Sequence, residues 1–377
     1  MQHGEADYRS FFDDTMRAGH YENNPATVDL MIRSSNSIIR DLVRRGVRFA
    51  RDDHGPCALP GRVHTPAPRI LFHEDITGHE ITQTLLNEVL RCENIELREH
   101  TTLLDFFADA SACGGVIAAG PDGEPRAIGA GAVVLACGGI GGLYKNSTNF
   151  PHITGDAIAM ALRHGVACEH LDYIQIHPTT LYSHRKGRRF LISESVRGEG
   201  ALLLDKNGNR FTNELQPRDV VSAAIRAQME KDGTDHVWED MRPIGEAAIR
   251  EHFPNILERC EEEGYDPIHE PIPVVPAQHY FMGGITVDLS SRTALPRLYA
   301  CGETCCNGVH GRNRLASNSL LESLVFAQRA ADDILYGEPP VFTGDKPDLA
   351  PYREQEPLFA AYRQEVLTAI ERSKNHE

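Results

Sequence analysis

The 377-residue sequence lacks several features that would place the protein in a membrane or on nucleic acid. It has no run of eighteen or more apolar residues, about the length that a membrane-spanning helix needs. Its first residues, MQHGEADYRSFFDD, have neither a basic segment nor an apolar stretch, unlike a secretory signal peptide. Positive charge is scarce, since 38 Lys and Arg face 54 Asp and Glu for a formal net charge of −16. We therefore expect a cytoplasmic protein without a membrane span and without a nucleic-acid partner.

The cysteines predict neither disulfides nor a metal site. There are nine of them, and an odd number without a signal peptide disfavours a disulfide framework. Cys301, Cys305 and Cys306 lie close together, but no second pair at the spacing of zinc ligands accompanies them. We expect buried, reduced thiols and no metal.

Hydrophobic periodicity predicts an α/β fold. Apolar residues at helical spacing predict helices over 25–46, 79–91, 219–231 and 318–336. Strand-like runs cover 95–107, 114–120, 131–137 and 173–182, and 201–213 contains an Asn207-Gly208 turn. A β-rich insertion thus separates two α/β segments and could form a lid over a cleft at the boundary. The last stretch, EPLFAAYRQEVLTAIERSKNHE, predicts an amphipathic helix with nothing downstream to pack against it.

The stretch AVVLACGGIGGLYKNSTN, residues 132–149, is the most glycine-dense part of the chain. A dinucleotide fingerprint needs G-x-G-x-x-G between a strand and a helix. The nearest register, 139–144, ends in Tyr144, and Asn149 and Pro151 disfavour a helix directly afterwards. We therefore do not expect a pyrophosphate loop here. Two interpretations remain: a strand whose glycines let a ligand approach the backbone, or a glycine turn between packed elements.

Five polar stretches share short Gly-, Pro- or Ser-rich surroundings. They are QIHPT with His177; ISESVRGEG with Ser193, Glu194, Arg197 and Glu199; QPRDV with Arg218; AQHYFMGG with His279; and HGRNRLASNSLLES with His310, Arg314, Asn318 and Ser319. Each has an ordinary explanation alone, because His before Pro is often structural and Arg beside Asp is often a surface pair. Together they gather arginines and histidines in an acidic chain. Forked guanidinium donors with imidazoles are suited to a small dianion.

Three longer motifs carry a family resemblance. GETCCNGVHGRNRLASNSLLESLVFAQRAADDI, PVVPAQHYFMGGITVD and RGEGALLLDKNGNRF together resemble the fumarate reductase/succinate dehydrogenase flavoprotein superfamily. The ASNSLLE form, IQIHPTTL and RILFHEDITGHEIT look more like its aspartate oxidase branch than its respiratory relatives. The resemblance extends from about residue 8 to residue 337.

The resemblance implies a two-segment, Rossmann-like FAD-binding domain, truncated at its N-terminus, with an inserted α+β capping domain. The implied boundaries are 1–173 for the first FAD segment, 174–279 for the capping domain, 280–337 for the second FAD segment and 338–377 for a remnant of a C-terminal helical domain.

The resemblance also implies roles for individual residues. Arg218 would donate or accept the proton, and Glu194 and Arg197 would relay protons to it. The residues implied to contact a dicarboxylate are His177, Ser193, His279 and Arg314. The residues implied to contact FAD are Gly138, Gly139, Asp156, Glu303, Asn318, Ser319 and Leu320. The dipole of the helix that begins at Asn318 would face the flavin pyrimidine.

The implied activity is FAD-dependent oxidation of L-aspartate to iminoaspartate, the first step of quinolinate and NAD synthesis. Electrons would pass to oxygen or to fumarate. One alternative is a flavoprotein that reduces fumarate or oxidises succinate, and another is a catalytically impaired fragment. A partner from the quinolinate pathway is possible on this resemblance alone.

The sequence departs from the family pattern in two places. The family begins with a strand and a G-x-G-x-x-G loop, which this sequence does not contain, so Met1 could be a misassigned start and FAD binding is expected to be far weaker. In addition, Gly61-Arg62-Val63 stands where aspartate oxidases carry an acidic residue for the substrate ammonium. A cation there would favour succinate or fumarate over aspartate.

Overall fold

The computed structural model describes residues 4–52, 55–56 and 69–375. Its helices are α1 (Glu5–Ala18), α2 (Pro25–Arg44), α3 (Thr77–Val89), α4 (Asp156–Arg163), α5 (Glu194–Gly198), α6 (Arg218–Asp232), α7 (Glu246–His252), α8 (Pro254–Glu262), α9 (Asn318–Tyr336) and α10 (Gln355–Lys374). Its strands are β1 (Arg51–Asp52), β2 (Gly55–Pro56), β3 (Thr102–Ala108), β4 (Cys113–Ala119), β5 (Pro125–Gly129), β6 (Val133–Leu135), β7 (Cys168–Glu169), β8 (Ile174–Leu181), β9 (Leu202–Leu204), β10 (Val237–Asp240), β11 (Ile272–Phe281), β12 (Gly284–Thr286), β13 (Leu298–Ala300) and β14 (Cys305–Cys306).

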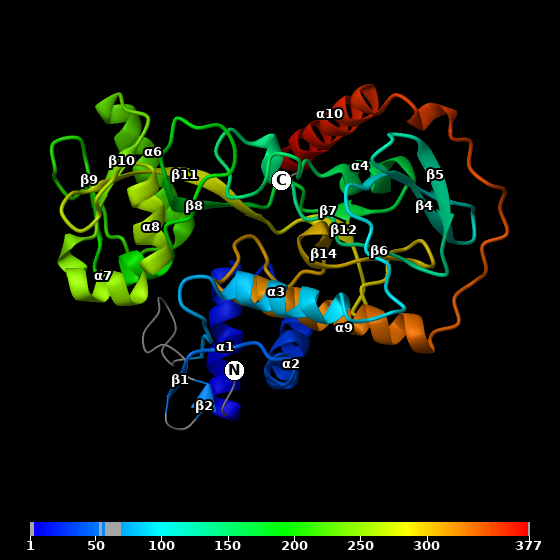
Figure 1. Cartoon of the computed structure of the whole chain (residues 1–377), viewed down its shortest axis with the longest axis horizontal. Helices are drawn as coiled ribbons and strands as arrows, with labels where there is room; N and C mark the ends of the chain where they lie inside the picture. Colours follow the sequence, from blue (N-terminus) through cyan, green and yellow to red (C-terminus); the bar gives the residue numbers. More distant parts are fainter. Residues whose placement is uncertain (1–3, 53–54, 57–68, 376–377) are drawn as a thin grey trace.

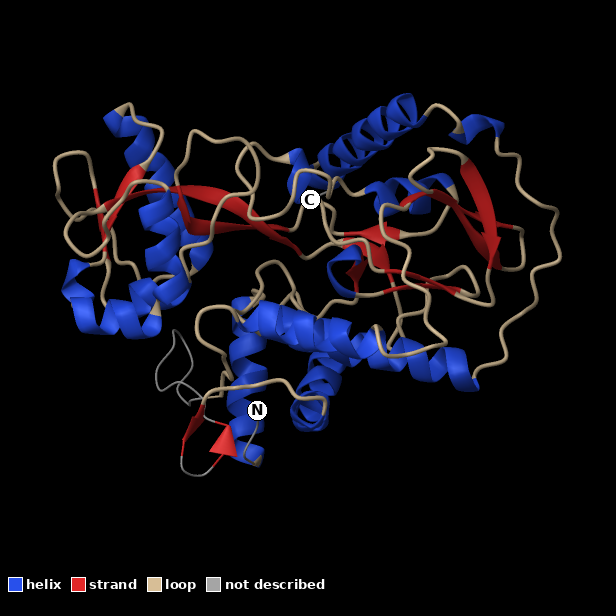
Figure 2. Cartoon of the chain, viewed as in Figure 1, coloured by secondary structure: helices blue, strands red, loops and turns tan. Residues whose placement is uncertain are grey.

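The chain forms a cap at one end, made of the elements from β8 to β11, and a body at the other, made of the remaining elements (Figure 1). The cap contains a four-stranded sheet in the order β8-β11-β10-β9, and all neighbouring strands are antiparallel. A separate hydrophobic core, which includes Val221, Ile225, Phe253 and Val274, fills the cap. Strands β8 and β11 run together from the cap into the body as one long ribbon (Figure 2). Register shifts interrupt their pairing between Val275 and Ala277 and between Gln278 and Tyr280.

The body contains three small sheets around the buried helix α4. Strands β6 and β13 pair in parallel, β3-β4-β5 form an antiparallel meander, and β14-β12-β7 form a mixed sheet. Residues from these strands and from α4, such as Leu135, Ile158 and Leu298, share one core. Because β6 and β13 are parallel, the segments that follow them leave the sheet at the same edge. That edge is where ligands bind in open α/β sheets.

The N-terminal helices pack beside the long helix α9. The side chain of Asn24 caps α2 by accepting the N–H of Ala26 at 3.0 Å, and Pro25 occupies the first helical position. The buried face of α2, with Met31 and Ile32, meets Phe326 of α9 in a common core. This packing places the start of α9 close to α1 and α2.

The structure confirms most of the predicted helices. The helix predicted over 318–336 has those bounds as α9, and α2, α3 and α6 lie within one or two residues of the expected ranges. The strand predicted to begin at Ile95 is wrong at its start, because residues 95–101 lie outside regular structure and β3 begins at Thr102. Helix α1 was not expected from the sequence.

The last predicted helix has its packing partner upstream in the chain, which the sequence did not indicate. Helix α10 packs on α4 and buries Tyr362, Val366 and Ile370. The hydroxyl of Tyr362 donates to the carbonyl of Leu104 at 2.8 Å. The guanidinium of Arg163 lies 4.4 Å from the Tyr362 ring centroid. The partner of this helix precedes it in the chain by about 200 residues, so local periodicity could not reveal it.

The structure is consistent with reduced, buried thiols. Cys301, Cys305 and Cys306 are free and buried, and burial raises the pKa of Cys306 to about 12. Within residues 4–52, 55–56 and 69–375, no group of three or more His, Cys, Asp or Glu side chains could hold a metal ion. None of the helices described in those ranges is both long and apolar enough to cross a bilayer.

Candidate active site

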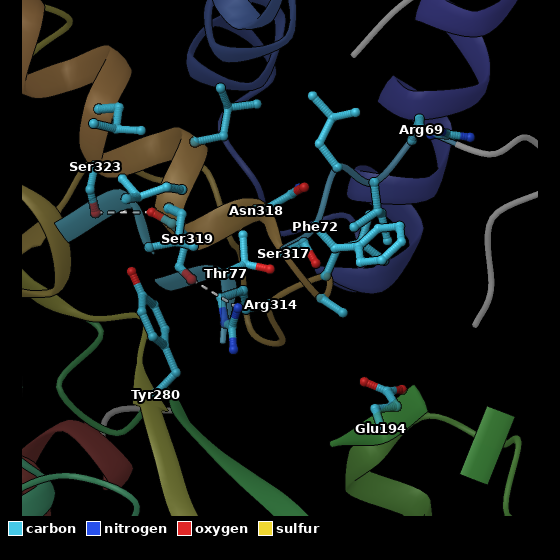
Figure 3. Close-up of a pocket in the computed structure, with 18 of the residues that line it drawn as sticks. Arg69, Phe72, Thr77, Glu194, Tyr280, Arg314, Ser317, Asn318, Ser319 and Ser323 are labelled. Carbon is cyan, nitrogen blue, oxygen red and sulfur yellow. Dashed lines mark hydrogen bonds between the residues drawn. The ribbon is translucent and has the colours of Figure 1, made fainter. Parts of the chain in front are cut away.

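A cavity of about 560 Å³ lies between the cap, the N-terminal helices and the start of α9 (Figure 3). Ten of the predicted site residues line it: His177, Ser193, Glu194, Arg218, His279, Glu303, Arg314, Asn318, Ser319 and Leu320. Four others, Arg197, Gly138, Gly139 and Asp156, are not among its lining residues. The predicted substrate residues therefore meet in one place, although they come from the cap, the ribbon and the body.

Arg218 is held by the protein at all three of its nitrogens. It is the first residue of α6, and its Nε and Nη2 donate to Glu194 Oε2 at 2.8 and 2.5 Å. Its Nη1 donates to Gln175 Oε1 at 2.8 Å. Both Arg218 and Glu194 have side chains about one-tenth exposed, so this ion pair is largely shielded from water.

Ser193 begins the short helix that carries Glu194. Its hydroxyl accepts the backbone N–H of Ser195 at 3.3 Å and lies 3.1 Å from the Ser195 hydroxyl. The side chain thus caps α5 while it lines the cavity. This geometry orients Glu194 toward Arg218, and contact of Ser193 with substrate stays a prediction.

Arg314 is buried but has few protein partners. Its Nη1 donates to Ser319 Oγ at 3.0 Å, and its guanidinium carbon lies 4.6 Å from the Tyr280 ring centroid. Within the described residues, its Nε has no hydrogen-bond partner. Burial, and after it the nearby positive charge of Arg218, lowers the pKa of Arg314 to about 10. A bound anion would satisfy the open donor and offset the buried charge.

His177 and His279 are neutral imidazoles at the edge of the same cavity. The backbone N–H of Thr179 donates to His177 Nδ1 at 3.2 Å, so in this tautomer the ring proton is on Nε2, which has no partner among the described residues. His279 Nδ1 lies 2.9 Å from Thr148 Oγ1. Burial first, and neighbouring arginines second, hold the pKa of both rings well below the usual range. They can therefore donate hydrogen bonds to an anion without adding charge.

Arg197 lies behind the cavity, inside the cap. Its Nη1 donates to the carbonyl of Glu214 at 2.8 Å, while its Nε and Nη2 have no partner among the described residues. Burial lowers its pKa, and the negative charge of Glu194 opposes that effect. Its part in a proton relay stays a prediction.

Three of the residues predicted to hold FAD lie where β6 and β13 end. Gly138 and Gly139 follow β6, and Glu303 follows β13 at the same edge of the sheet. A Cβ on Gly139 would lie 2.5 Å from Glu303 Oε1, so only glycine allows this approach. Burial raises the pKa of Glu303 to about 7. A buried carboxyl beside bare backbone fits a ligand that presents hydroxyl groups, such as the ribose and ribityl parts of FAD.

The remaining predicted FAD residues lie at two helix starts. Asp156 begins α4, and its Oδ1 accepts the hydroxyl of Thr154 at 2.7 Å. Asn318 begins α9, but its side-chain amide donates to Thr15 Oγ1 at 3.1 Å and so ties α9 to α1. Ser319 accepts from Arg314, and Leu320 presents a partly exposed side chain to the cavity. The first turn of α9 thus fits a flavin ring through its backbone rather than through the Asn318 side chain.

Two residues of the site were missed from the sequence. Gln175 accepts from Arg218, and its Nε2 donates at 2.8 Å both to Asn313 Oδ1 and to the Arg314 carbonyl. It therefore links Arg218 to the segment that carries Arg314. Tyr280 covers Arg314 with its ring. The alternation of Gln175 and His177 along β8 was a usable signal for the first, whereas Tyr280 depends on the irregular register of β11.

Gly61-Arg62-Val63, which stands where aspartate oxidases carry an acidic residue, lies outside the described residues.

Comparison with known proteins agrees with this geometry. Residues 1–320 match the family model described as an FAD binding domain. The chain is 47% identical over 332 residues to an L-aspartate oxidase of Clostridium perfringens, covering 88% of this chain and 75% of that protein. It is 42% identical over 374 residues to an L-aspartate oxidase of Nostoc sp., covering 94% of this chain and 64% of that one.

A solved structure of a variant of the E. coli quinol fumarate reductase FrdA matches with a TM-score of 0.81 and 30% identity, covering 97% of this chain and 65% of that chain. The chain thus spans between about two-thirds and three-quarters of the lengths of these relatives. The sequence match and the arrangement of the cavity lead to one conclusion: the chain belongs to the L-aspartate oxidase family of FAD-dependent oxidoreductases.

Proposed function

We propose that the protein oxidises L-aspartate to iminoaspartate, with FAD as the electron acceptor. The observation that carries this proposal is the pair of buried, partnerless donors in one cavity, Arg314 Nε and His177 Nε2. Such atoms are costly to bury unless a ligand completes them. A small dicarboxylate supplies the required acceptors at both ends. Two relatives named L-aspartate oxidase support aspartate as the substrate.

The charges around the cavity favour a dianion over a neutral ligand. Arg314 contributes a positive charge that burial destabilises, as its lowered pKa shows. An anion beside it therefore stabilises the charged form strongly. The neutral rings of His177 and His279 add hydrogen bonds that do not depend on protonation near pH 7. Together these groups would hold the two carboxylates and fix the carbon chain between them.

We assign proton exchange with the substrate to Arg218. Bound FAD would accept the hydride from the substrate carbon. The proton that leaves the substrate needs an acceptor on the cap side of the cavity. Arg218 is suited to this step because Glu194 accepts from its Nε and Nη2 and can take up the proton that the guanidinium passes on. Gln175 holds Nη1 and keeps the guanidinium in one orientation.

Reduction of fumarate is the second candidate function. It is supported by the match to the E. coli quinol fumarate reductase over 97% of this chain. The same cavity would hold fumarate by its two carboxylates, and Arg218 would donate the proton instead of accepting it. The two candidates therefore differ in the ligand and in the direction of transfer, and they use the same residues.

The experiment supplies FAD to the purified chain and measures turnover of the two ligands separately. Aspartate oxidation is followed by the reduction of an added acceptor, and fumarate reduction by the oxidation of an added low-potential dye. We expect aspartate to be turned over faster. Turnover of fumarate alone would favour the second candidate. If neither ligand were turned over and calorimetry detected no binding of dicarboxylate, the proposal would be wrong.

A further inference from the structure

One carboxylate of the body caps a helix of the cap. Asp75 lies in the segment just before α3, and its Oδ2 accepts the backbone N–H of Ile256 at 3.2 Å. Its Oδ1 accepts a hydrogen bond from the side-chain amide of Asn255. Both partners belong to the first turn of α8, which is 180 residues further along the chain. This contact therefore joins two distant parts of the fold.

Helix α8 has no capping side chain of its own. Its N-cap residue is Phe253, whose side chain makes no capping hydrogen bond, and Pro254 follows at the first helical position. The first-turn N–H groups of a helix need acceptors, and the helix dipole favours a negative charge there. Phe253 and Ile256 are buried in the cap core, so water is partly excluded from this end. Asp75 supplies both the acceptor and the charge.

The segment that carries Asp75 also forms a wall of the cavity. Phe72 and Thr77, on either side of Asp75 in the chain, line the cavity opposite Glu194 of the cap (Figure 3). A shift of the cap away from Asp75 would therefore widen the cavity and move Arg218 and Glu194 away from the body.

A second contact between cap and body is much weaker. His20 Nε2 lies 3.9 Å from Asp219 Oδ2, and the two side chains are 47% and 49% exposed. Exposed ion pairs of this kind contribute little, because water and salt screen them. The contact of Asp75 with α8 is therefore stronger than the contact of His20 with Asp219.

We propose that Asp75 is a positioning residue that holds the cap closed over the cavity by capping α8. Closure places Arg218 and Glu194 against the bound substrate. The consequence for turnover rests on the proposed function, whereas closure itself does not.

Hydrogen exchange of the purified chain, measured by mass spectrometry, tests closure without any turnover. In Asp75→Ala we expect amides at 255–257 and at the cavity-lining segments 193–198 and 315–320 to exchange about three- to thirtyfold faster. Asp75→Asn keeps an acceptor for the Ile256 N–H and should restore most of the protection.

Two further variants serve as controls. Asp205 accepts the N–H groups of Asn207 and Asn209 at 2.8 and 2.9 Å within an exposed turn of the cap. Asp205→Ala therefore removes a comparable pair of hydrogen bonds, and faster exchange should stay confined to that turn. His20→Ala should leave exchange at the cavity unchanged. Faster exchange in Asp75→Ala that is limited to residues 255–257 would reduce Asp75 to a local helix cap and overturn the proposal.

A second measurement connects closure to the substrate. In an active protein, Asp75→Ala should raise the KM for dicarboxylate about tenfold, with Asp75→Asn close to the parent protein. An unchanged KM in a variant whose cavity exchanges faster would contradict the positioning role. If the parent protein turns over neither ligand, the proposed function fails, and the exchange data still decide whether Asp75 closes the cap.

Discussion

The two arginines that face each other across the cavity are bound in opposite ways. On the cap side, Arg218 has all three nitrogens bonded to Glu194 and Gln175. On the body side, Arg314 has one hydrogen bond to Ser319, a Tyr280 ring over it and an Nε without a partner among the described residues. The protein thus neutralises Arg218 on the cap side of the cavity, whereas it leaves Arg314 on the body side for a ligand.

This difference separates two tasks that a dicarboxylate enzyme must perform. An arginine that is already paired with a carboxylate gains little from a substrate anion, but it has a route for passing on a proton. An arginine with an open donor and a pKa lowered to about 10 gains most from an anion. We therefore assign proton exchange to the Arg218 side and anchoring to the Arg314 side, and the predictions for Arg218, Arg314 and Ser319 test this division.

The largest effect is expected on the cap side. Arg218→Leu should lower turnover by about 10²- to 10⁴-fold, the usual range for the loss of a general acid or base. Dicarboxylate affinity, measured by calorimetry, should change much less, because the carboxylates are held elsewhere. Arg218→Lys, which retains the charge, serves as the control for the loss of positive charge. A parallel loss of affinity and turnover in the Leu variant would remove the distinction between the two arginines.

The opposite pattern is expected for Arg314. Arg314→Met should weaken dicarboxylate binding by about 10- to 150-fold, the effect of losing about 1.5 to 3 kcal/mol of charged hydrogen bonding. Arg314→Lys should recover part of this affinity, since the charge returns without the planar fork. Calorimetric titration with succinate measures both. Unchanged binding in the Met variant would show that the open Nε is not an anchoring point.

The third prediction concerns Glu239, a buried carboxyl near Arg197. Burial raises the pKa of Glu239 from 4.5 to about 8, and its oxygens have no hydrogen-bond partner among the described residues. The folded state therefore binds a proton that the unfolded state releases between about pH 4.5 and 8, and stability falls as the pH rises through that window.

Glu239→Gln should flatten this fall by up to about 1.4 kcal/mol per pH unit, measured by urea unfolding at several pH values. Glu258→Gln, an exposed change on the neighbouring helix α8, is the matched control and should leave the slope unchanged. An identical slope in the parent and Glu239→Gln would mean that the carboxyl is not buried in its neutral form.

The smallest effect is expected for Ser319→Ala. Ser319 Oγ accepts the hydrogen bond from Arg314 Nη1, but the burial of Arg314 and its contact with Tyr280 remain without it. We expect dicarboxylate binding to weaken by less than about fivefold, as for one modest hydrogen bond. A loss as large as that of Arg314→Met would show that Ser319, rather than the buried setting, fixes the guanidinium.

The sequence predicted those parts of the fold that depend on local signals. Helix α2 was identifiable because Asn24 and Pro25 mark its start, and α9 because its apolar residues keep helical spacing to Tyr336. Helix α10 was identifiable as a helix but not as a packed one, since its partner surface on α4 is remote in the chain. The strand expected at Ile95 failed because alternation alone does not supply a neighbouring strand.

The site was predictable by residue type and not by geometry. Motifs singled out His177, Arg218 and Arg314, and the structure brings them to one cavity. The sequence could not show that Gln175 links Arg218 to the segment that carries Arg314, because that requires β8, α6 and the segment before α9 to meet in space. Asp75 escaped notice for the same reason, as its partner helix lies 180 residues away.

The two register shifts in β11 limit where the chain can change in length. Between them and just after them lie Ala277, Gln278 and Tyr280, with His279 in the second shift. Inserting or deleting one residue in this ribbon would exchange the sides to which His279 and Tyr280 project, and would disturb both ends of the cavity at once. Length variation is therefore tolerated best at the exposed turns of the cap, such as 205–209, which lie away from the ribbon. A grafted peptide or a fused domain is therefore best inserted in the turn at 205–209.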